Sequence, residues 1–365
     1  MRLILPLLIL SVSSVATASP SISGGIWANY RYTTDSDFSS AAFNEELDNE
    51  TLGDVADEAL ILYVDDRQEG SPWSISAEMR FGPGSFTQPT NNSTGDTFGL
   101  HKAWIGYGIS ETRNIKLGKS QMPFGWKTVN FWPGDLLLGG YGDQMDVGVK
   151  YSETGESIKY QVAYYHADDW GETSTDTMDD NGHWGSSETY RKVQTFVGNV
   201  DFRVADQQWI GVSLQSGGLQ DLVPLSPPAL ATPDPAASEI SGDHSAWNVH
   251  YDGTFDKLSV KAQWLDVSRD IPGSTTEIKN QRVAVNLGYA VNERWFTYID
   301  ATWADTDTTG NTADAVTAFA PGARYKYGPG WIYIEYLAST GDIGRDGDIY
   351  EADFDAFYTS IDYYF

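Results

Sequence analysis

The stretch FYTSIDYYF, residues 357–365, alternates large apolar side chains with polar ones and places an aromatic residue at its last position. Counting by twos puts Phe357, Ile361 and Phe365 on one face and Asp362 on the other. A period of two is what an extended strand needs to bury one side and wet the other. A single strand of this kind fits a soluble sandwich as well as a membrane barrel, so the rest of the chain has to decide.

The same alternation recurs along the chain, for example in WSISAEMRF at 73–81 and IKYQVAYY at 158–165. No change in composition marks a second domain. The pattern predicts strands at about 22–33, 59–66, 73–81, 98–109, 115–119, 146–152, 157–166, 189–204, 208–215, 244–254, 258–267, 281–291, 294–303, 315–327, 331–339 and 352–365.

Connections between these strands alternate between short and long. The long ones are expected at about 34–58, 82–97, 120–145, 167–188, 216–243, 268–280, 304–314 and 340–351. A soluble sandwich has no reason to separate loop lengths in this way, whereas outer-membrane barrels have short periplasmic turns and long external loops. The sequence therefore predicts an all-β fold, a 16-stranded antiparallel transmembrane β-barrel over residues 19–365, with long acidic extracellular loops.

The first 18 residues, MRLILPLLILSVSSVATA, contain one basic residue, an apolar run from Leu3 to Leu10 and the tripeptide Ala16-Thr17-Ala18. This order is typical of a secretory signal peptide. An N-terminal membrane anchor is the alternative, but the apolar run is too short to span a bilayer. We expect export of the chain to the outer membrane of a Gram-negative bacterium.

Charge and composition exclude several classes of function. The chain has 51 Asp and Glu against 23 Lys and Arg, a formal net charge of −28, and no cysteine. Such a charge disfavours nucleic-acid binding, and the lack of cysteine excludes disulfides and thiolate metal sites. Acidic residues concentrate in the long loops, where divalent cations could bridge them to lipopolysaccharide. No cofactor and no specific metal site are expected: DTDTTGNTAD at 305–314 begins like a calcium loop, but Thr309 and Val316 occupy ligand positions.

Charged residues at inward positions would be costly against lipid but are stable in water. The candidates for lining a pore are Arg31, Glu78, Arg80, Lys102, Lys116, Lys127, Lys150, Lys159, Lys261, Arg282, Asp300, Arg324, Lys326 and Glu335. Two interpretations stay open. These residues either solvate the lumen and pair across strands, or form a basic ladder that concentrates anions.

A barrel of this size leaves an aqueous channel, so a segment that narrows it is expected. The third long loop, within GKSQMPFGWKTVNFWPGDLLLGGYGDQ at 118–144, is low in charge and rich in Gly, Pro and aromatic residues. Residues 120–144 are therefore the predicted constriction; an external loop with an apolar cap is the alternative. The candidate residues are Pro123, Phe124, Gly125, Trp126, Phe131, Trp132 and Asp135.

KAWIGYGISETRNIKLGKSQMPFGW, Lys102 to Trp126, resembles the paired strands followed by Pro-Phe-Gly of the porin O and P family within the porin superfamily. The final Phe365 also resembles the assembly signal of bacterial outer-membrane proteins. The resemblance implies a homotrimeric diffusion channel with its third loop in the pore. Phosphate selectivity in that family rests on lysines in the constriction, where this chain has Lys127 alone, so the solute class stays open.

The predicted function is an outer-membrane porin for small hydrophilic solutes and ions. An anion- or phosphate-selective porin is the first alternative, and a barrel-bound hydrolase or an adhesin is the second. The sequence contains five histidines but no G-x-S-x-G motif, so enzymatic activity is not expected. Acidic loops and basic inward residues oppose each other, which predicts weak ion selectivity.

Overall fold

The computed structural model describes residues 20–36, 53–67, 70–82, 98–126, 136–138, 144–167, 190–221, 239–343 and 348–365. The predicted signal peptide lies outside these residues. Within the described ranges, no helix is long and apolar enough to cross a membrane.

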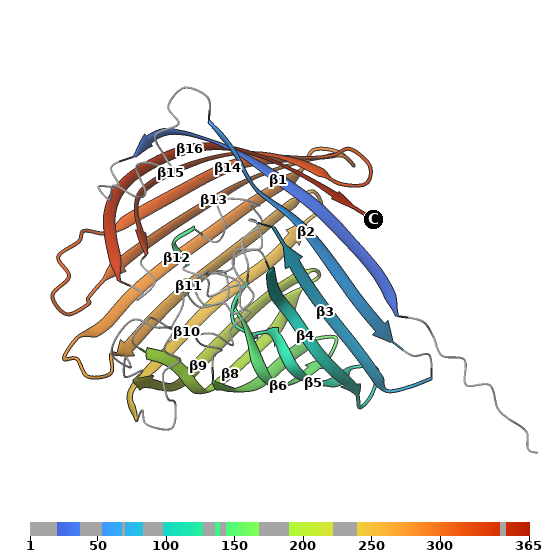
Figure 1. Cartoon of the computed structure of the whole chain (residues 1–365), viewed down its shortest axis with the longest axis horizontal. Coiled ribbons are helices and arrows are strands. Elements are labelled where there is room, and N and C mark those ends of the chain that lie inside the picture. The colour runs from blue at the N-terminus through green and yellow to red at the C-terminus, as the bar shows by residue number, and fades with distance from the viewer. Residues whose placement is uncertain are drawn as a thin grey trace, which may run out of the picture.

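The described residues form sixteen antiparallel strands in one closed barrel (Figure 1). Each strand pairs with its neighbours in sequence, and β1 also pairs with β16. A short 3-10 helix, η3 (Leu136–Leu138), precedes β6. The strands are β1 (Ser21–Ser36), β2 (Asp54–Arg67), β3 (Trp73–Phe81), β4 (Phe98–Gly108), β5 (Arg113–Gln121), β6 (Met145–Thr154), β7 (Ile158–Ala167), β8 (Tyr190–Ala205), β9 (Gln208–Asp221), β10 (Ile240–Phe255), β11 (Leu258–Asp270), β12 (Glu277–Ala290), β13 (Trp295–Thr306), β14 (Val316–Lys326), β15 (Trp331–Ile343) and β16 (Ile349–Tyr364).

The seam between β1 and β16 closes the barrel. Ala28 pairs with Ile361 along this seam, and the backbones of Gly24 and Phe365 exchange two hydrogen bonds of 3.0 and 2.9 Å. The predicted sixteen-stranded antiparallel barrel is therefore confirmed, and a closed sheet leaves no edge strand exposed to pairing with another chain.

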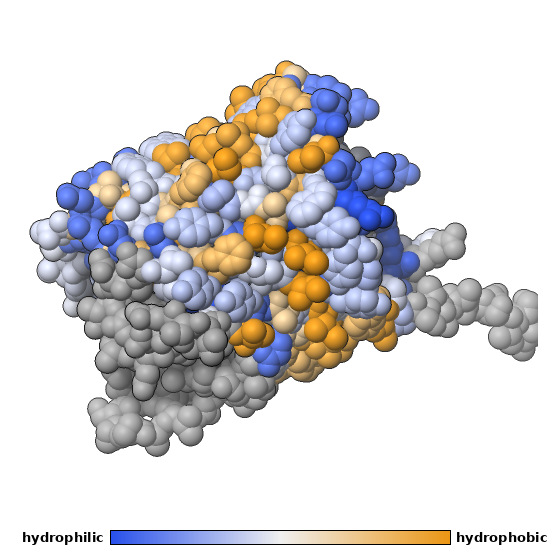
Figure 2. Space-filling model, turned by 90° about the horizontal axis from the view of Figure 1, so that it is seen from above, coloured by the Kyte–Doolittle hydropathy of each residue, from blue (hydrophilic) through white to orange (hydrophobic). Residues whose placement is uncertain are grey.

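Side chains alternate between two different environments. On β12, Arg282 and Asn286 on the inward face are 0 % exposed, whereas Leu287 on the outward face is 44 % exposed. The outward faces carry Val, Ile, Leu and aromatic residues throughout the barrel. On the face seen in Figure 2, hydrophobic residues run across the middle and hydrophilic residues gather toward both ends. This inverts the arrangement of a soluble protein and suits a barrel surrounded by lipid.

Several strands extend beyond their predicted ends on the side of the long connections. β9 reaches Asp221 and β15 reaches Ile343, and β11 and β12 leave only residues 271–276 between them. The expected loop at 268–280 was therefore too long, and Asp270 and Glu277 belong to strands. The polar and glycine-rich ends of these strands resemble loops in sequence, but pairing with the neighbouring strand holds them extended.

Candidate functional site

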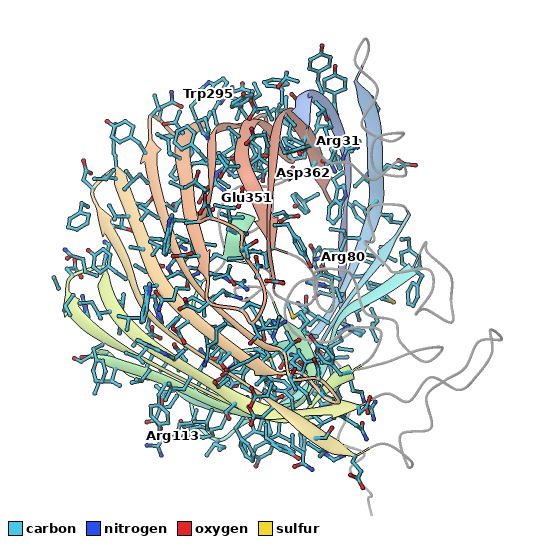
Figure 3. All side chains as sticks on the ribbon, turned by 90° about the vertical axis from the view of Figure 1, so that its left-hand side faces the viewer. Arg31, Arg80, Arg113, Trp295, Glu351 and Asp362 are labelled. Carbon is cyan, nitrogen blue, oxygen red and sulfur yellow. The ribbon has the colours of Figure 1, made fainter. Side chains whose placement is uncertain are left out.

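The structure turns the charged candidates on the strands toward the inside of the barrel, as their registers and burial show. Figure 3 shows Arg31, Arg80 and Asp362 on the inner side, whereas Arg113 and Trp295 lie on the outer side. The inward candidates are Arg31, Glu78, Arg80, Lys102, Lys116, Lys150, Lys159, Lys261, Arg282, Asp300, Arg324, Lys326 and Glu335. Lys127 lies outside the described residues.

Most of the inward cations lie against aromatic rings. The ammonium of Lys159 is 3.7 Å from the ring centroid of Trp209, and that of Lys116 is 4.1 Å from Trp104. The guanidinium carbon of Arg324 is 4.7 Å from the Phe296 ring. Further pairs are Lys102 with Tyr63, Arg80 with Trp27, Lys261 with Trp126, and both Arg324 and Lys326 with Trp331.

The inward carboxylates are held mainly by neutral donors. Asn286 Nδ2 donates to Asp300 Oδ1 at 2.9 Å, and the hydroxyl of Tyr298 donates to Glu335. The backbone N of Trp331 donates to Asp362 Oδ1 at 2.6 Å. Ion pairs on this face include Arg80 with Glu78 at 3.0 Å, Lys261 with Asp252 at 3.4 Å and Lys192 with Asp146 at 3.5 Å.

The described parts of the segment at 120–144 pack against the inner wall. Met122 and Phe124 join a buried cluster with Tyr165 of β7 and Leu265 of β11. Pro123 between them is also buried. Farther along, Leu137 packs with residues of β13 to β16, and Leu138 packs with Trp126 and Ala284. The candidates Phe131, Trp132 and Asp135 lie outside the described residues.

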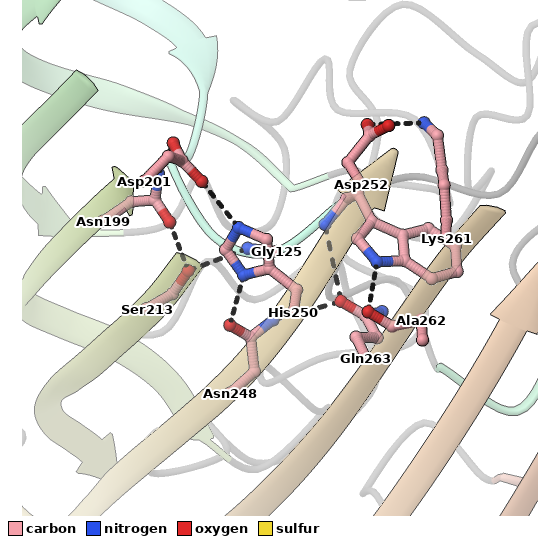
Figure 4. A network of polar contacts seen from close by, with 11 residues as sticks. Gly125, Asn199, Asp201, Ser213, Asn248, His250, Asp252, Lys261, Ala262 and Gln263 are labelled. Carbon is pink, nitrogen blue, oxygen red and sulfur yellow. Dashed lines mark hydrogen bonds and ion pairs between the residues drawn. The ribbon is translucent and has the colours of Figure 1, made fainter. Parts of the chain in front are cut away.

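Residues 125 and 126 are tied to the wall by a continuous chain of hydrogen bonds (Figure 4). The first half runs over β8 and β9. Gly125 N donates to Ser213 Oγ at 3.0 Å, Ser213 donates to Asn199 Oδ1 at 2.8 Å, and Asn199 Nδ2 donates to Asp201 Oδ2 at 2.8 Å.

The second half of the chain returns over β10 and β11. Asp201 Oδ1 lies 2.8 Å from His250 Nε2, and His250 Nδ1 lies 3.1 Å from Asn248 Oδ1. Asn248 Nδ2 donates to Gln263 Oε1 at 3.1 Å, and the same oxygen accepts from Trp126 N at 3.4 Å. We call these six wall residues, Asn199, Asp201, Ser213, Asn248, His250 and Gln263, the wall network.

Gly125 fits the wall network because it has no side chain. Its φ is +60°, a value that favours glycine. A Cβ here would lie 2.4 Å from Asn248 Nδ2 and 2.6 Å from Gln263 Oε1. The network therefore requires glycine at this position for two independent reasons.

A second attachment lies near η3. Arg282 Nη1 donates to the backbone oxygen of Leu138, and Arg282 Nε donates to Asn280 Oδ1 at 2.7 Å. Arg282, predicted as a pore-lining residue, therefore contacts the segment at 120–144 directly.

The wall network was not predicted from the sequence. The period of two places its members on inward faces. The contact between Asp201 on β8 and His250 on β10, however, depends on how each of these strands pairs with β9, and the sequence pattern does not give that register. The described residues contain no group of three or more His, Cys, Asp or Glu side chains suited to hold a metal ion.

Comparisons with known proteins place this geometry in context. No family model and no curated protein matches the chain. Among solved structures, outer-membrane OmpT of Vibrio cholerae is similar, with 12 % identity, a TM-score of 0.61, and coverage of 95 % of this chain and 97 % of its own. The outer membrane channel DcaP of Acinetobacter baumannii gives 13 % identity, a TM-score of 0.61 and the same two coverages.

An anion-selective porin from Comamonas acidovorans gives 10 % identity and a TM-score of 0.61, with coverage of 95 % of this chain and 99 % of its own. Identities this low establish similarity of fold alone, and the resemblance to the porin O and P family stays a prediction. The chain folds as the closed β-barrel seen in bacterial outer-membrane porins.

Proposed function

We propose that this protein is a porin, a water-filled channel in the bacterial outer membrane for passive diffusion of small hydrophilic solutes and ions. One observation carries the proposal: the same strands place charged side chains inside the barrel and apolar ones outside. An Arg or Lys facing lipid at the bilayer midplane costs about 2–4 kcal/mol, so the two faces require water inside and lipid outside.

Residues 120–144 are proposed to narrow this channel. Their support is the packing of Met122 and Phe124 on the wall, the wall network at Gly125, and the hydrogen bond from Arg282 to Leu138. These attachments lie on adjoining parts of the inner wall, β7 to β12 for residues 122–126 and β12 to β16 for Leu137 and Leu138, so both described parts of the segment lie inside the barrel.

Two partners follow from this function. The apolar outer face would contact outer-membrane lipid, and acidic loops would bind lipopolysaccharide through divalent cations. A homotrimer is the proposed assembly, and OmpT of Vibrio cholerae, which is similar in fold, has been solved in a trimer form.

A hydrolase is the alternative from another class, because Asp201 and His250 form an acid and base pair beside Ser213. In the wall network, however, Ser213 donates its proton to Asn199 and accepts from Gly125 N. A serine nucleophile needs a hydrogen bond to its base, so this arrangement favours a structural role and a channel without enzymatic activity.

Reconstitution in planar bilayers tests the proposal. Folded protein should give discrete, ohmic conductance steps, and liposomes containing it should swell in isotonic solutions of small sugars. Folded protein that inserts without conducting would contradict the porin function, and an esterase or protease assay on the same sample would then identify the hydrolase alternative. An adhesin would neither conduct nor hydrolyse, and would instead bind a surface ligand.

A further inference from the structure

A cluster of cations and rings lies on the inner wall formed by β2 to β6. Lys102 lies 5.9 Å from the ring of Tyr63, and Lys116 lies 4.1 Å from the ring of Trp104. Lys102 and Trp104 are two residues apart on β4, and Trp104 and Lys116 face the same side of adjacent strands. We call these four residues the lysine-ring patch.

Within the part of the chain that the structure describes, neither Lys102 nor Lys116 forms an ion pair with a carboxylate. Glu78 lies opposite Lys102 in register, but its carboxylate contacts Arg80 Nε at 3.0 Å. Lys150, directly opposite Lys116, adds a third positive charge and donates to the backbone oxygen of Gln121 at 2.6 Å.

The indole of Trp104 lies along the wall, over Gly106 of the same strand. A Cβ at Gly106 would stand 2.8 Å from Trp104 Cζ3, so the absence of a side chain at Gly106 makes room for the indole. Lys102, Trp104 and Lys116 remain partly exposed. The wall therefore presents two accessible ammonium groups beside an aromatic surface.

From this placement we propose that the lysine-ring patch binds aromatic carboxylates during their passage through the channel, a proposal that rests on the porin function above. The carboxylate would bind the ammonium groups of Lys102 and Lys116 through charge-assisted hydrogen bonds. Its ring would pack against the indole of Trp104 and, like that indole, would lie close to the ammonium of Lys116. Inorganic anions would gain the charge interaction but nothing from the ring.

Two more cations lie against aromatic rings near the same end of the barrel, where the short turns are. Arg324 is 4.7 Å from the ring of Phe296 and 4.9 Å from that of Trp331, and Lys159 is 3.7 Å from that of Trp209. Like the lysines of the patch, Arg324 and Lys159 form no ion pair among the described residues. An aromatic carboxylate that leaves the patch would therefore meet further surfaces of the same chemistry.

The test compares three carboxylates as blockers of chloride conductance in planar bilayers: benzoate, cyclohexanecarboxylate and acetate. Benzoate should half-block the channel at a concentration about tenfold below that for acetate, because one aromatic contact contributes on the order of a tenfold gain in affinity. Cyclohexanecarboxylate should fall between them. Equal block by benzoate and acetate, equal block by benzoate and cyclohexanecarboxylate, or stronger block by inorganic phosphate would overturn the proposal.

Variants locate the site. Trp104→Leu should lower the advantage of benzoate over acetate several-fold, whereas Lys116→Gln should weaken block by both. The matched controls are Trp247→Leu, which removes an outward-facing indole, and Lys257→Gln, which removes an exposed lysine in the turn between β10 and β11. Both controls should behave as the unchanged protein; a loss of benzoate block in the controls as large as in the patch variants would contradict the assignment.

A second measurement separates this proposal from the porin function. Saturation-transfer NMR of folded protein in detergent detects benzoate binding without any conductance. If the protein fails to conduct but binds benzoate, and Trp104→Leu removes that binding, the porin function is refuted and the binding site at the lysine-ring patch is supported. Conductance without benzoate binding would do the reverse.

Discussion

Two parts of the inner wall use their polar residues differently. On β8 to β11, the wall network satisfies its own donors and acceptors and ends on Gly125 and Trp126. On β2 to β6, Lys102 and Lys116 lie on rings and pair with no described carboxylate. A buried polar network stabilises a single arrangement when it is fully satisfied, whereas accessible charges remain available to solutes. The first region is therefore suited to position a segment, and the second to contact what passes.

The largest effect should come from a change at the end of the wall network. Gly125→Ala adds a Cβ that collides with Asn248 and Gln263 and also meets an unfavourable φ, so residues 122–126 should detach and conductance should rise. Gly273→Ala is the matched control, since Gly273 has a similar φ of +69° and nothing within 4 Å of its Cβ position. Backbone strain alone costs about 1–2 kcal/mol. Equal conductance of the two variants would show that the collision does not matter.

A smaller effect is expected from the second attachment. Arg282→Leu removes the donor to the Leu138 oxygen, and a buried acceptor left without a partner costs about 1–3 kcal/mol. Conductance should become noisier as the segment near η3 loosens, while the wall network at Gly125 stays intact. Single-channel recordings measure the noise, and recordings as quiet as those of the unchanged protein would indicate that Arg282 does not hold the segment.

Ion selectivity should change moderately when the other region is altered. The unchanged protein should select weakly, with cation preference strongest in dilute salt, because loop charges are screened over about 8–10 Å at physiological ionic strength. Lys102→Gln combined with Lys116→Gln should lower the chloride to potassium permeability ratio by a factor on the order of two at high salt, since wall charges act at close range. Reversal potentials across a salt gradient measure both effects. A strong anion preference of the unchanged protein at every ionic strength would favour the phosphate-channel alternative.

The smallest effect should follow a change on the outer face. Arg113 contacts Glu153 at 3.0 Å, but both side chains face away from the lumen and are partly or largely exposed. Arg113→Gln should leave conductance and selectivity unchanged and lower the thermal unfolding temperature slightly at most, because exposed ion pairs contribute little. An altered permeability ratio would mean that charge outside the barrel influences the pore.

Sequence reasoning predicted the parts of this structure that depend on a period of two. It placed Arg80 and Arg282 inward, because the alternation along one strand assigns each side chain to a face without any knowledge of distant residues. It did not predict how far β9 and β15 extend, because QSGGLQD and STGDI contain residues typical of turns. It also did not predict the wall network, because that depends on registers that add up across three seams and on where residues 122–126 fold back.

The closed topology also has a consequence for the order in which the protein folds. Every seam except the one between β1 and β16 joins strands that follow each other along the chain, so each can form as a local hairpin. The β1 and β16 seam instead brings together residues such as Trp27 and Asp362 from nearly opposite ends of the described chain. Closing so large a loop costs conformational entropy. That cost is small only when the intervening strands have already formed and hold β1 and β16 close together. Folding should therefore proceed as growth of an open, curved sheet, and the last and slowest step should be the meeting of its two edges.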